Sequence, residues 1–129
     1  MRFSILVMLL ISFKSLAFDD YKCMITNAVS SNENGKLIKV GDKSVNGKMF
    51  TVDRSSGVMV GPIKNNYINE PIVLDFGSTD NSFKAVTTMR NEITTNVYVL
   101  TIQEFIDGSR KPFVFLSNSD VFYGYCEHF

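Results

Sequence analysis

Two cysteines, Cys23 and Cys126, carry the clearest chemical signal in this chain of 129 residues. They are its only cysteines, and in an oxidising compartment an even pair is most simply a disulfide. Such a bond would join the beginning of the main part of the chain to its end. In the chain-entropy model, closing a loop of this size stabilises the fold by about 4–5 kcal/mol. We therefore predict a disulfide, with two free thiols or a nucleophilic cysteine as the alternatives.

The other groups that could do chemistry form no recognisable catalytic or metal-binding pattern. The single histidine, His128, precedes only the last residue, whereas a catalytic histidine base must be held rigidly by its neighbours. Zinc sites need several cysteine and histidine ligands, which this composition does not supply. The carboxylates that could serve in glycoside hydrolysis are Asp53, Asp75, Glu92 and Glu104. Any small protein carries such a set, so we expect no enzyme activity, no metal site and no cofactor.

The segment around Asp53 and Arg54 is the first candidate for contact with a partner. It lies between two short β-rich stretches and has the pattern of a strand, a tight turn and a second strand. Asp53 can cap such a turn through its side chain, and Gly57 can supply the positive φ that the turn requires. Arg54 can either pair locally with Asp53 or contact a partner, and both interpretations stay open.

An aromatic pair near the C-terminus is the second candidate. Tyr123 and Tyr125 alternate with Cys126, so they lie on the opposite face of the last expected strand. If Cys126 points into the core, both tyrosines point outward. Tyrosine is enriched at protein interfaces, and it is also ordinary core material in β proteins.

The first 17 residues have the organisation of a secretory signal peptide. Arg2 gives a basic start, an apolar run follows from Phe3 to Phe13, and Ser15 and Ala17 are the small residues that a signal peptidase reads. The run is shorter than the ~20 apolar residues that span a bilayer. We expect residues 1–17 to be a signal peptide and residues 18–129 to be a single domain, periplasmic or secreted, with no membrane span.

The nearly neutral charge of the remaining chain argues against partners that bind strongly basic surfaces, such as nucleic acid and anionic lipid. Loss of residues 1–17 removes Arg2, Lys14 and no acid, which leaves 11 basic residues against the 13 acidic ones. A nearly neutral, mixed surface has no basic stripe for nucleic acid and no polybasic patch for anionic lipid. We therefore expect neither nucleic acid nor a membrane surface among the partners.

Turn signals divide the chain into short apolar stretches. Asn-Gly and Asp-Gly pairs, which favour hairpin turns because both residues tolerate positive φ, occur at 34–35, 46–47 and 107–108. The β-rich stretches between turns cover residues 49–52, 58–60, 82–90, 94–105 and 113–116. The stretch 82–90 alternates like a half-buried strand, while 94–105 is apolar on both faces and is expected to be central. This pattern predicts an all-β fold.

The expected architecture is a small antiparallel β-barrel or a curled meander, and the alternative is a two-sheet sandwich. If Cys23 and Cys126 bond, the first and last strands lie either side by side or face to face. Side by side indicates a closed up-and-down barrel, and face to face indicates a sandwich with an inter-sheet bridge. Because hairpin-like connections dominate, the barrel or meander is favoured.

The functional expectation is an exported, non-enzymatic protein that recognises another protein, as inhibitors and immunity proteins do. Turns and aromatic residues are ample, and the catalytic patterns are weak. The rival hypothesis is a small barrel that holds an apolar molecule, although the 11 phenylalanines favour a filled interior. The oligomeric state is not determined by the sequence.

Overall fold

The strands of this protein form a single antiparallel sheet in a computed structural model that describes residues 18–39 and 45–129. Across these residues there is no α-helix, and no helical segment has the length and apolar character needed to cross a membrane. The strands are β1 (Tyr21–Ser31), β2 (Leu37–Lys39), β3 (Met49–Val52), β4 (Met59–Val60), β5 (Ile72–Phe76), β6 (Phe83–Arg90), β7 (Thr95–Ile102), β8 (Lys111–Ser117) and β9 (Asp120–His128). The all-β prediction is confirmed. The expected signal peptide, residues 1–17, lies outside the described residues.

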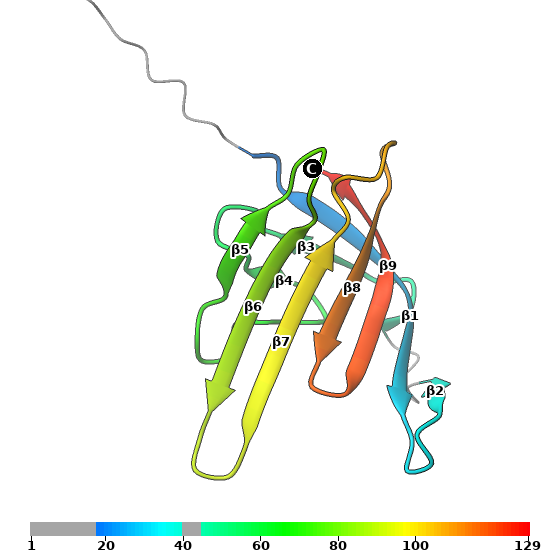
Figure 1. Cartoon of the computed structure of the whole chain (residues 1–129), viewed down its shortest axis with the longest axis vertical. Helices are drawn as coiled ribbons and strands as arrows, with labels where there is room; N and C mark the ends of the chain where they lie inside the picture. Colours follow the sequence, from blue (N-terminus) through cyan, green and yellow to red (C-terminus); the bar gives the residue numbers. More distant parts are fainter. Residues whose placement is uncertain (1–17, 40–44) are drawn as a thin grey trace, which may run out of the picture.

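The sheet curls into a half-barrel, as Figure 1 shows. Its strand order is β4-β3-β1-β9-β8-β7-β6-β5, and β2 pairs with the remaining part of β1. From β5 to β9 each strand pairs with the next one in sequence, which is the arrangement of a meander. The predicted curled meander is therefore confirmed, and the alternative two-sheet sandwich does not form.

The first and last long strands lie side by side and are joined by the predicted disulfide. Cys23 of β1 is directly opposite Cys126 of β9, and the bonded pair is fully buried. This pairing was expected to close a barrel, but β1 also pairs with β3 along its other edge. The terminal strands therefore meet within the sheet, and among the described strands β4 and β5 end the strand order.

A β-bulge in β1 bends the sheet next to the disulfide, and a glycine makes room for it. The register between β1 and β9 shifts between Ile25 and Asn27. Opposite this shift, a Cβ added to Gly124 would lie 1.9 Å from the carbonyl oxygen of Met24. Any other residue at this position would push β1 away. Because bulges increase local twist, Gly124 permits the curl that the half-barrel requires.

The core fills the inner face of the curled sheet. The largest aromatic side chains enclosed there are Tyr21, Phe50, Phe83, Phe113 and Phe115. The alternation expected for residues 82–90 is observed in β6, where positions 83, 85 and 87 are buried and the outward positions are exposed or half-buried. The stretch 94–105, expected to be central, forms β7 between β6 and β8. Among the described residues, the buried core side chains occupy the interior of the half-barrel, as the number of phenylalanines suggested.

The sequence analysis did not predict two of the observed strands, β2 and β5. β2 is short and fully exposed, and β5 is interrupted by a bulge between Val73 and Asp75. The sequence of β5 is apolar at four of its five positions, so no apolar–polar alternation marks it, although exposed and half-buried positions alternate along the folded strand. It ends the strand order of the sheet.

The disulfide should contribute strongly to stability, because it links residues 103 positions apart. The double variant Cys23→Ala/Cys126→Ala is expected to lose about 4 kcal/mol of unfolding free energy, since the unfolded chain regains its loop entropy. Urea unfolding measures this loss, and the wild-type protein with a reductant should show a similar one. An unchanged unfolding midpoint in both samples would contradict the assignment.

Thr87 offers a site where stability should increase. Its side chain is 2% exposed, and within the described residues its hydroxyl has no hydrogen-bond partner. Thr87→Val keeps the branched shape and removes the unpaired hydroxyl, so unfolding free energy should rise by about 1 kcal/mol. The matched control, Thr88→Val on the exposed face of β6, should change it by less than about 0.5 kcal/mol. Equal effects at both positions would rule out the stated cause.

Candidate functional site

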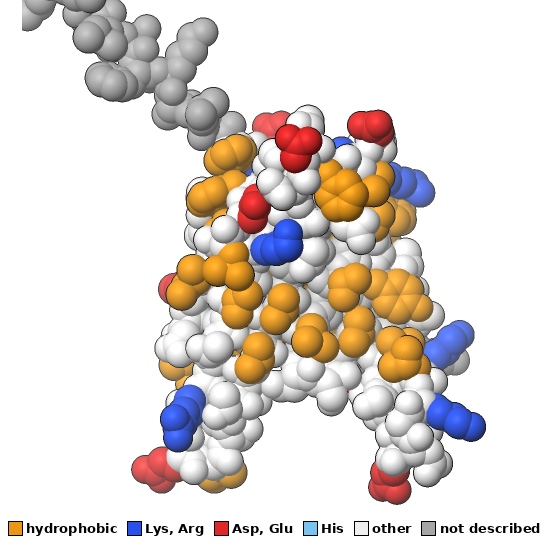
Figure 2. Space-filling model, viewed as in Figure 1, with side chains coloured by type: hydrophobic (Ala, Val, Ile, Leu, Met, Phe, Trp, Pro, Cys, Tyr) orange, Lys and Arg blue, Asp and Glu red, His pale blue; other side chains and the backbone are white. Residues whose placement is uncertain are grey.

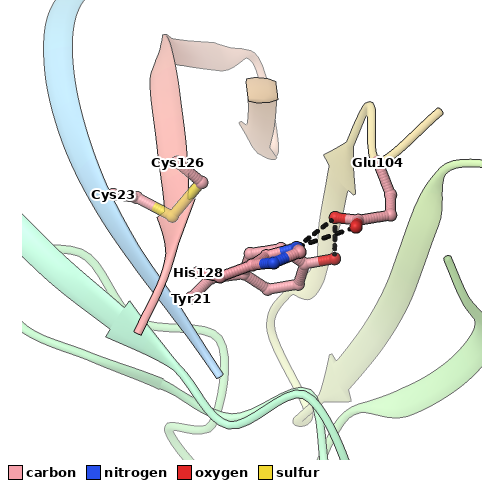
Figure 3. Close-up of a disulfide and its surroundings, with 5 residues drawn as sticks. All are labelled: Tyr21, Cys23, Glu104, Cys126 and His128. Atoms are coloured by element: carbon pink, nitrogen blue, oxygen red, sulfur yellow. Dashed lines mark hydrogen bonds and ion pairs between the residues drawn. A yellow bond between two sulfur atoms is a disulfide. The ribbon is translucent and has the colours of Figure 1, made fainter. Parts of the chain in front are cut away.

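A buried carboxylate, Glu104, organises a polar cluster at one end of the half-barrel. Glu104 follows β7, and its side chain is 10% exposed. It accepts a hydrogen bond of 2.7 Å from the Tyr21 hydroxyl, and its two oxygens lie 2.7 and 3.0 Å from Nε2 of His128 (Figure 3). Tyr21 and His128 are direct neighbours across β1 and β9. One carboxylate therefore ties the first and last strands to the loop after β7.

Arg54 adds a buried cation to the same cluster. Its Nε donates to the carbonyl oxygen of Phe76 at 2.7 Å, and its Nη2 donates to that of Gly77 at 3.0 Å. The guanidinium also lies 4.0 Å from Glu104 and is only 5.0 Å from the centre of the Tyr21 ring. The residue as a whole is 5% exposed. Arg54 thus joins the β3–β4 turn to the end of β5 across the open side of the sheet.

The local structure of the β3–β4 turn explains why Arg54 points inward. The Asp53 carboxylate accepts hydrogen bonds from the backbone N–H groups of Ser55 and Ser56 and from the Ser55 hydroxyl. These bonds, led by the Ser55 hydroxyl, lower the pKa of Asp53. Gly57, at φ +80°, completes the turn and packs closely on Ala85 of β6. The hydrogen bonds of Asp53 and the packing of Gly57 on Ala85 fix the shape of the turn, which directs the Arg54 side chain inward.

The electrostatics of the cluster favour an ionised Glu104. Burial by itself would raise the pKa of Glu104, but hydrogen bonds from His128 and Tyr21 and the charges of His128 and Arg54 lower it overall. For Tyr21, burial raises the pKa, and the hydrogen bond to Glu104 raises it further. The tyrosine therefore stays protonated and acts as a hydrogen-bond donor. The contacts of Glu104 with Tyr21, His128 and Arg54 connect four parts of the chain, so we interpret the cluster as structural.

The position of His128 corrects the sequence interpretation. A penultimate residue was expected to fray, whereas His128 is the last residue of β9. Besides Glu104, its Nδ1 lies 3.9 Å from Asp19, and its ring packs at 5.6 Å from that of Tyr21. The position of His128 is related to that of the disulfide. With Cys23 opposite Cys126, the antiparallel register also sets Tyr21 opposite His128.

The four residues predicted to contact a partner occupy different environments. Asp53 is exposed at the β3–β4 turn, whereas Arg54 is enclosed in the cluster and so takes no part in the partner surface proposed below. Tyr123 and Tyr125 are half-buried on the outer face of β9, opposite the buried Cys126, as alternation predicted. The Tyr125 ring is covered by Arg110, whose guanidinium carbon lies 4.1 Å from the ring centre.

The outer face of the sheet carries a feature that sequence reasoning missed. Six apolar residues, one from each of six neighbouring strands, stand directly opposite one another in register. From β1 to β5 this apolar row consists of Val29, Val121, Leu116, Val99, Val86 and Ile72. No charged residue interrupts it. The row emerges only when the strands are aligned, because its members are scattered through the sequence.

Further apolar side chains widen the row. Ile72 and Leu74 are 68% and 64% exposed on the free edge strand β5. Val97 and Val114 are exposed on either side of the row, and Tyr123 lies next to Val114 across β8 and β9. Figure 2 shows this band across the middle of the face, with charged side chains above it and near the hairpin tips below. This outer face is the candidate functional site.

The search for a metal centre among the described residues and for similar proteins gave no match that bears on function. Across residues 18–39 and 45–129, no group of three or more histidine, cysteine or acidic side chains could hold a metal ion. Comparison of the chain with protein-family models, with curated proteins and with solved structures finds no match. The argument about function therefore depends on this chain's own geometry.

The Glu104 cluster predicts a dependence of stability on pH. Because the folded state lowers the pKa of Glu104, its contribution is present above the unfolded value of about 4.3 and is lost as pH falls through the folded value. Glu104→Gln should lose about 1–3 kcal/mol of unfolding free energy at pH 7. It should also respond less steeply than wild type to acid below about pH 5. Urea unfolding between pH 3 and pH 7 measures both effects.

The exposed Glu92 provides the matched control for this experiment. Glu92→Gln, in the β6–β7 turn, removes one carboxylate outside the cluster and should leave the pH profile of wild type unchanged. Parallel profiles for wild type and Glu104→Gln would show that Glu104 does not stabilise the fold through its charge.

Proposed function

We propose that this protein is an exported, non-enzymatic binding protein that recognises another exported protein through the outer face of its sheet. The apolar row across β1, β9, β8, β7, β6 and β5 carries the proposal. Five of the six residues in the row are half-buried, and Ile72 is 68% exposed, so the row offers a continuous apolar surface. Contiguous apolar surface of this kind marks sites of interaction. Tyr123 at the side of the row is of a residue type enriched in interfaces.

Export is supported by two independent features. Residues 1–17 have the pattern of a signal peptide, and the buried Cys23–Cys126 bond is compatible with an oxidising compartment outside the cytoplasm. The partner would then be a periplasmic or extracellular protein, and the binding would be of the kind that inhibitors and immunity proteins perform.

The shape of the site favours a partner that presents an apolar strand. β5 is a terminal strand of the sheet, and Ile72 and Leu74 project from it while its outer edge pairs with no described strand. A partner strand added at this edge would bond to the free backbone groups and continue the apolar row on its own side chains. The bulge in β5 and Pro71 before it limit how far uncontrolled pairing can extend.

A pair of lysine substitutions tests this proposal. Leu74→Lys places a charge at the edge of the row, whereas Ile93→Lys does so at the 96% exposed tip of the β6–β7 hairpin, away from the row. Native mass spectrometry of protein recovered from its own exported compartment should show a second protein with wild type and Ile93→Lys. Leu74→Lys should lower the complexed fraction about tenfold or more.

Site-specific photocrosslinking locates the contact directly. A photoreactive residue at Leu74 or Val114 should crosslink to the same second protein, and one at Ile93 should not. A partner that is retained equally by all variants, or that crosslinks only from Ile93, would refute this surface. A bare chain in every sample would refute stable protein recognition. Crosslinks to a second copy of this chain would show self-association through this face and would refute recognition of a different protein.

A further inference from the structure

A pocket opens at the end of the half-barrel opposite the Glu104 cluster. It has a volume of about 260 Å³ and is lined by residues from the loop after β4 and from β8 and β9, with Val45 at one side. Asp120 and Phe122 of β9 line it, whereas His128 ends the same strand in the cluster. The pocket is therefore separate from both the cluster and the apolar row.

Aromatic rings form a continuous series beside this pocket. Tyr67 lies 5.7 Å from Tyr98, Tyr98 lies 6.3 Å from Phe115, and Phe115 lies 6.1 Å from Phe122, measured between ring centres. Tyr67, Phe115 and Phe122 line the pocket directly. Phe115 is fully buried, while Tyr67 is 60% exposed at the open side. Such spacing suits the stacking of another flat ring against the series.

The loop that contributes Lys64 and Tyr67 to the pocket is held in place by buried anchors. Asn65 is 1% exposed, and its amide group donates to the Gly57 carbonyl at 2.8 Å and accepts from the Met59 N–H at 3.0 Å. Ile63, two residues earlier, is buried in the core. Lys64 lies between these two anchors and lines the pocket. The loop therefore presents Lys64 from a preformed position, as ligand sites generally do.

Opposite charges line the pocket together. Lys64 comes from the loop and Asp120 from the start of β9, and Ser117 adds a hydroxyl between the strands. Within the described residues, neither Lys64 nor Asp120 takes part in an ion pair. A ligand that bears both an anionic and a cationic group would satisfy both side chains at once.

We propose that this pocket binds a small planar aromatic molecule that carries both a carboxylate and an ammonium group, as an aromatic amino acid does. The ring would stack beside Tyr67 and Phe122, the carboxylate would meet Lys64, and the ammonium would meet Asp120. The volume is adequate, because a cavity of about 150 Å³ accommodates benzene. The proposal is independent of the protein-binding face, which lies on the outer side of the sheet.

Four indole probes test the three contacts separately. Tryptophan carries both charged groups, indole-3-acetate only the carboxylate, tryptamine only the ammonium, and indole neither. Binding of each probe to the mature protein is measured by NMR titration. We expect tryptophan to bind most tightly and indole most weakly, with each charged group adding about fivefold.

The variants assign each charged group to its partner. Lys64→Gln should weaken the binding of tryptophan and indole-3-acetate about fivefold and leave that of tryptamine unchanged. Asp120→Asn should weaken the binding of tryptophan and tryptamine about fivefold and leave that of indole-3-acetate unchanged. Tyr67→Ala should weaken all four probes. Tyr125→Ala, an aromatic truncation on the outer face, serves as the control and should change none.

Folding of every variant is checked by its urea unfolding midpoint, so a loss of binding is not confused with a loss of structure. Absence of tryptophan binding at millimolar concentration would overturn the proposal. So would equal affinities for the four probes, or charge variants that leave the affinity for tryptophan unchanged. None of these outcomes bears on the outer face, which the lysine substitutions test.

Discussion

The pairing of β1 with β9 is the constraint on which the rest of the structure depends. The Cys23–Cys126 bond sets the register of the two strands, and Gly124 allows the bulge of β1 to pass against β9. A shift by one residue would turn the buried faces of both strands toward solvent. Because β1 accepts β9 on one edge and β2 and β3 on the other, it links the meander to the remaining strands.

The two ends of β9 have different surroundings. The Glu104 cluster lies at one end, and the pocket lined by Asp120 lies at the other. At its C-terminal end, His128 and Glu104 complete a network in which Arg54 reaches across to the end of β5. The side chains of Glu104 and Arg54 are largely buried there, and their opposite charges lie 4.0 Å apart, so they hold elements together. At its N-terminal end, Asp120 lines a space beside aromatic rings and has no ion-pair partner within the described residues. Breaking this buried pair would leave one charge without its partner, and that cost holds the cluster together, whereas the charge of Asp120 is available to a ligand.

Local patterns predicted the strand faces well and the polar cluster poorly. Alternation correctly placed Tyr123 and Tyr125 on the face opposite Cys126, because successive side chains of a strand point to opposite faces regardless of its neighbours. Arg54 was ambiguous, since the carbonyl groups that bind it belong to residues 22 and 23 positions later. The sequence interpretation gave His128 no role because it lies near the chain end, whereas antiparallel pairing with Cys23 opposite Cys126 sets it opposite Tyr21.

The sequence by itself determined an all-β chain, its disulfide and the inward or outward direction of most strand residues. These properties follow from turn chemistry, cysteine number and a period of two, all of which act locally. Only the tertiary structure decided that β1 lies between β9 and β3, that Glu104 meets His128, and that Val29 and Ile72 end one continuous apolar row. Such relations depend on cross-strand register, which bulges and the curl of the whole sheet set together, and no single segment encodes them.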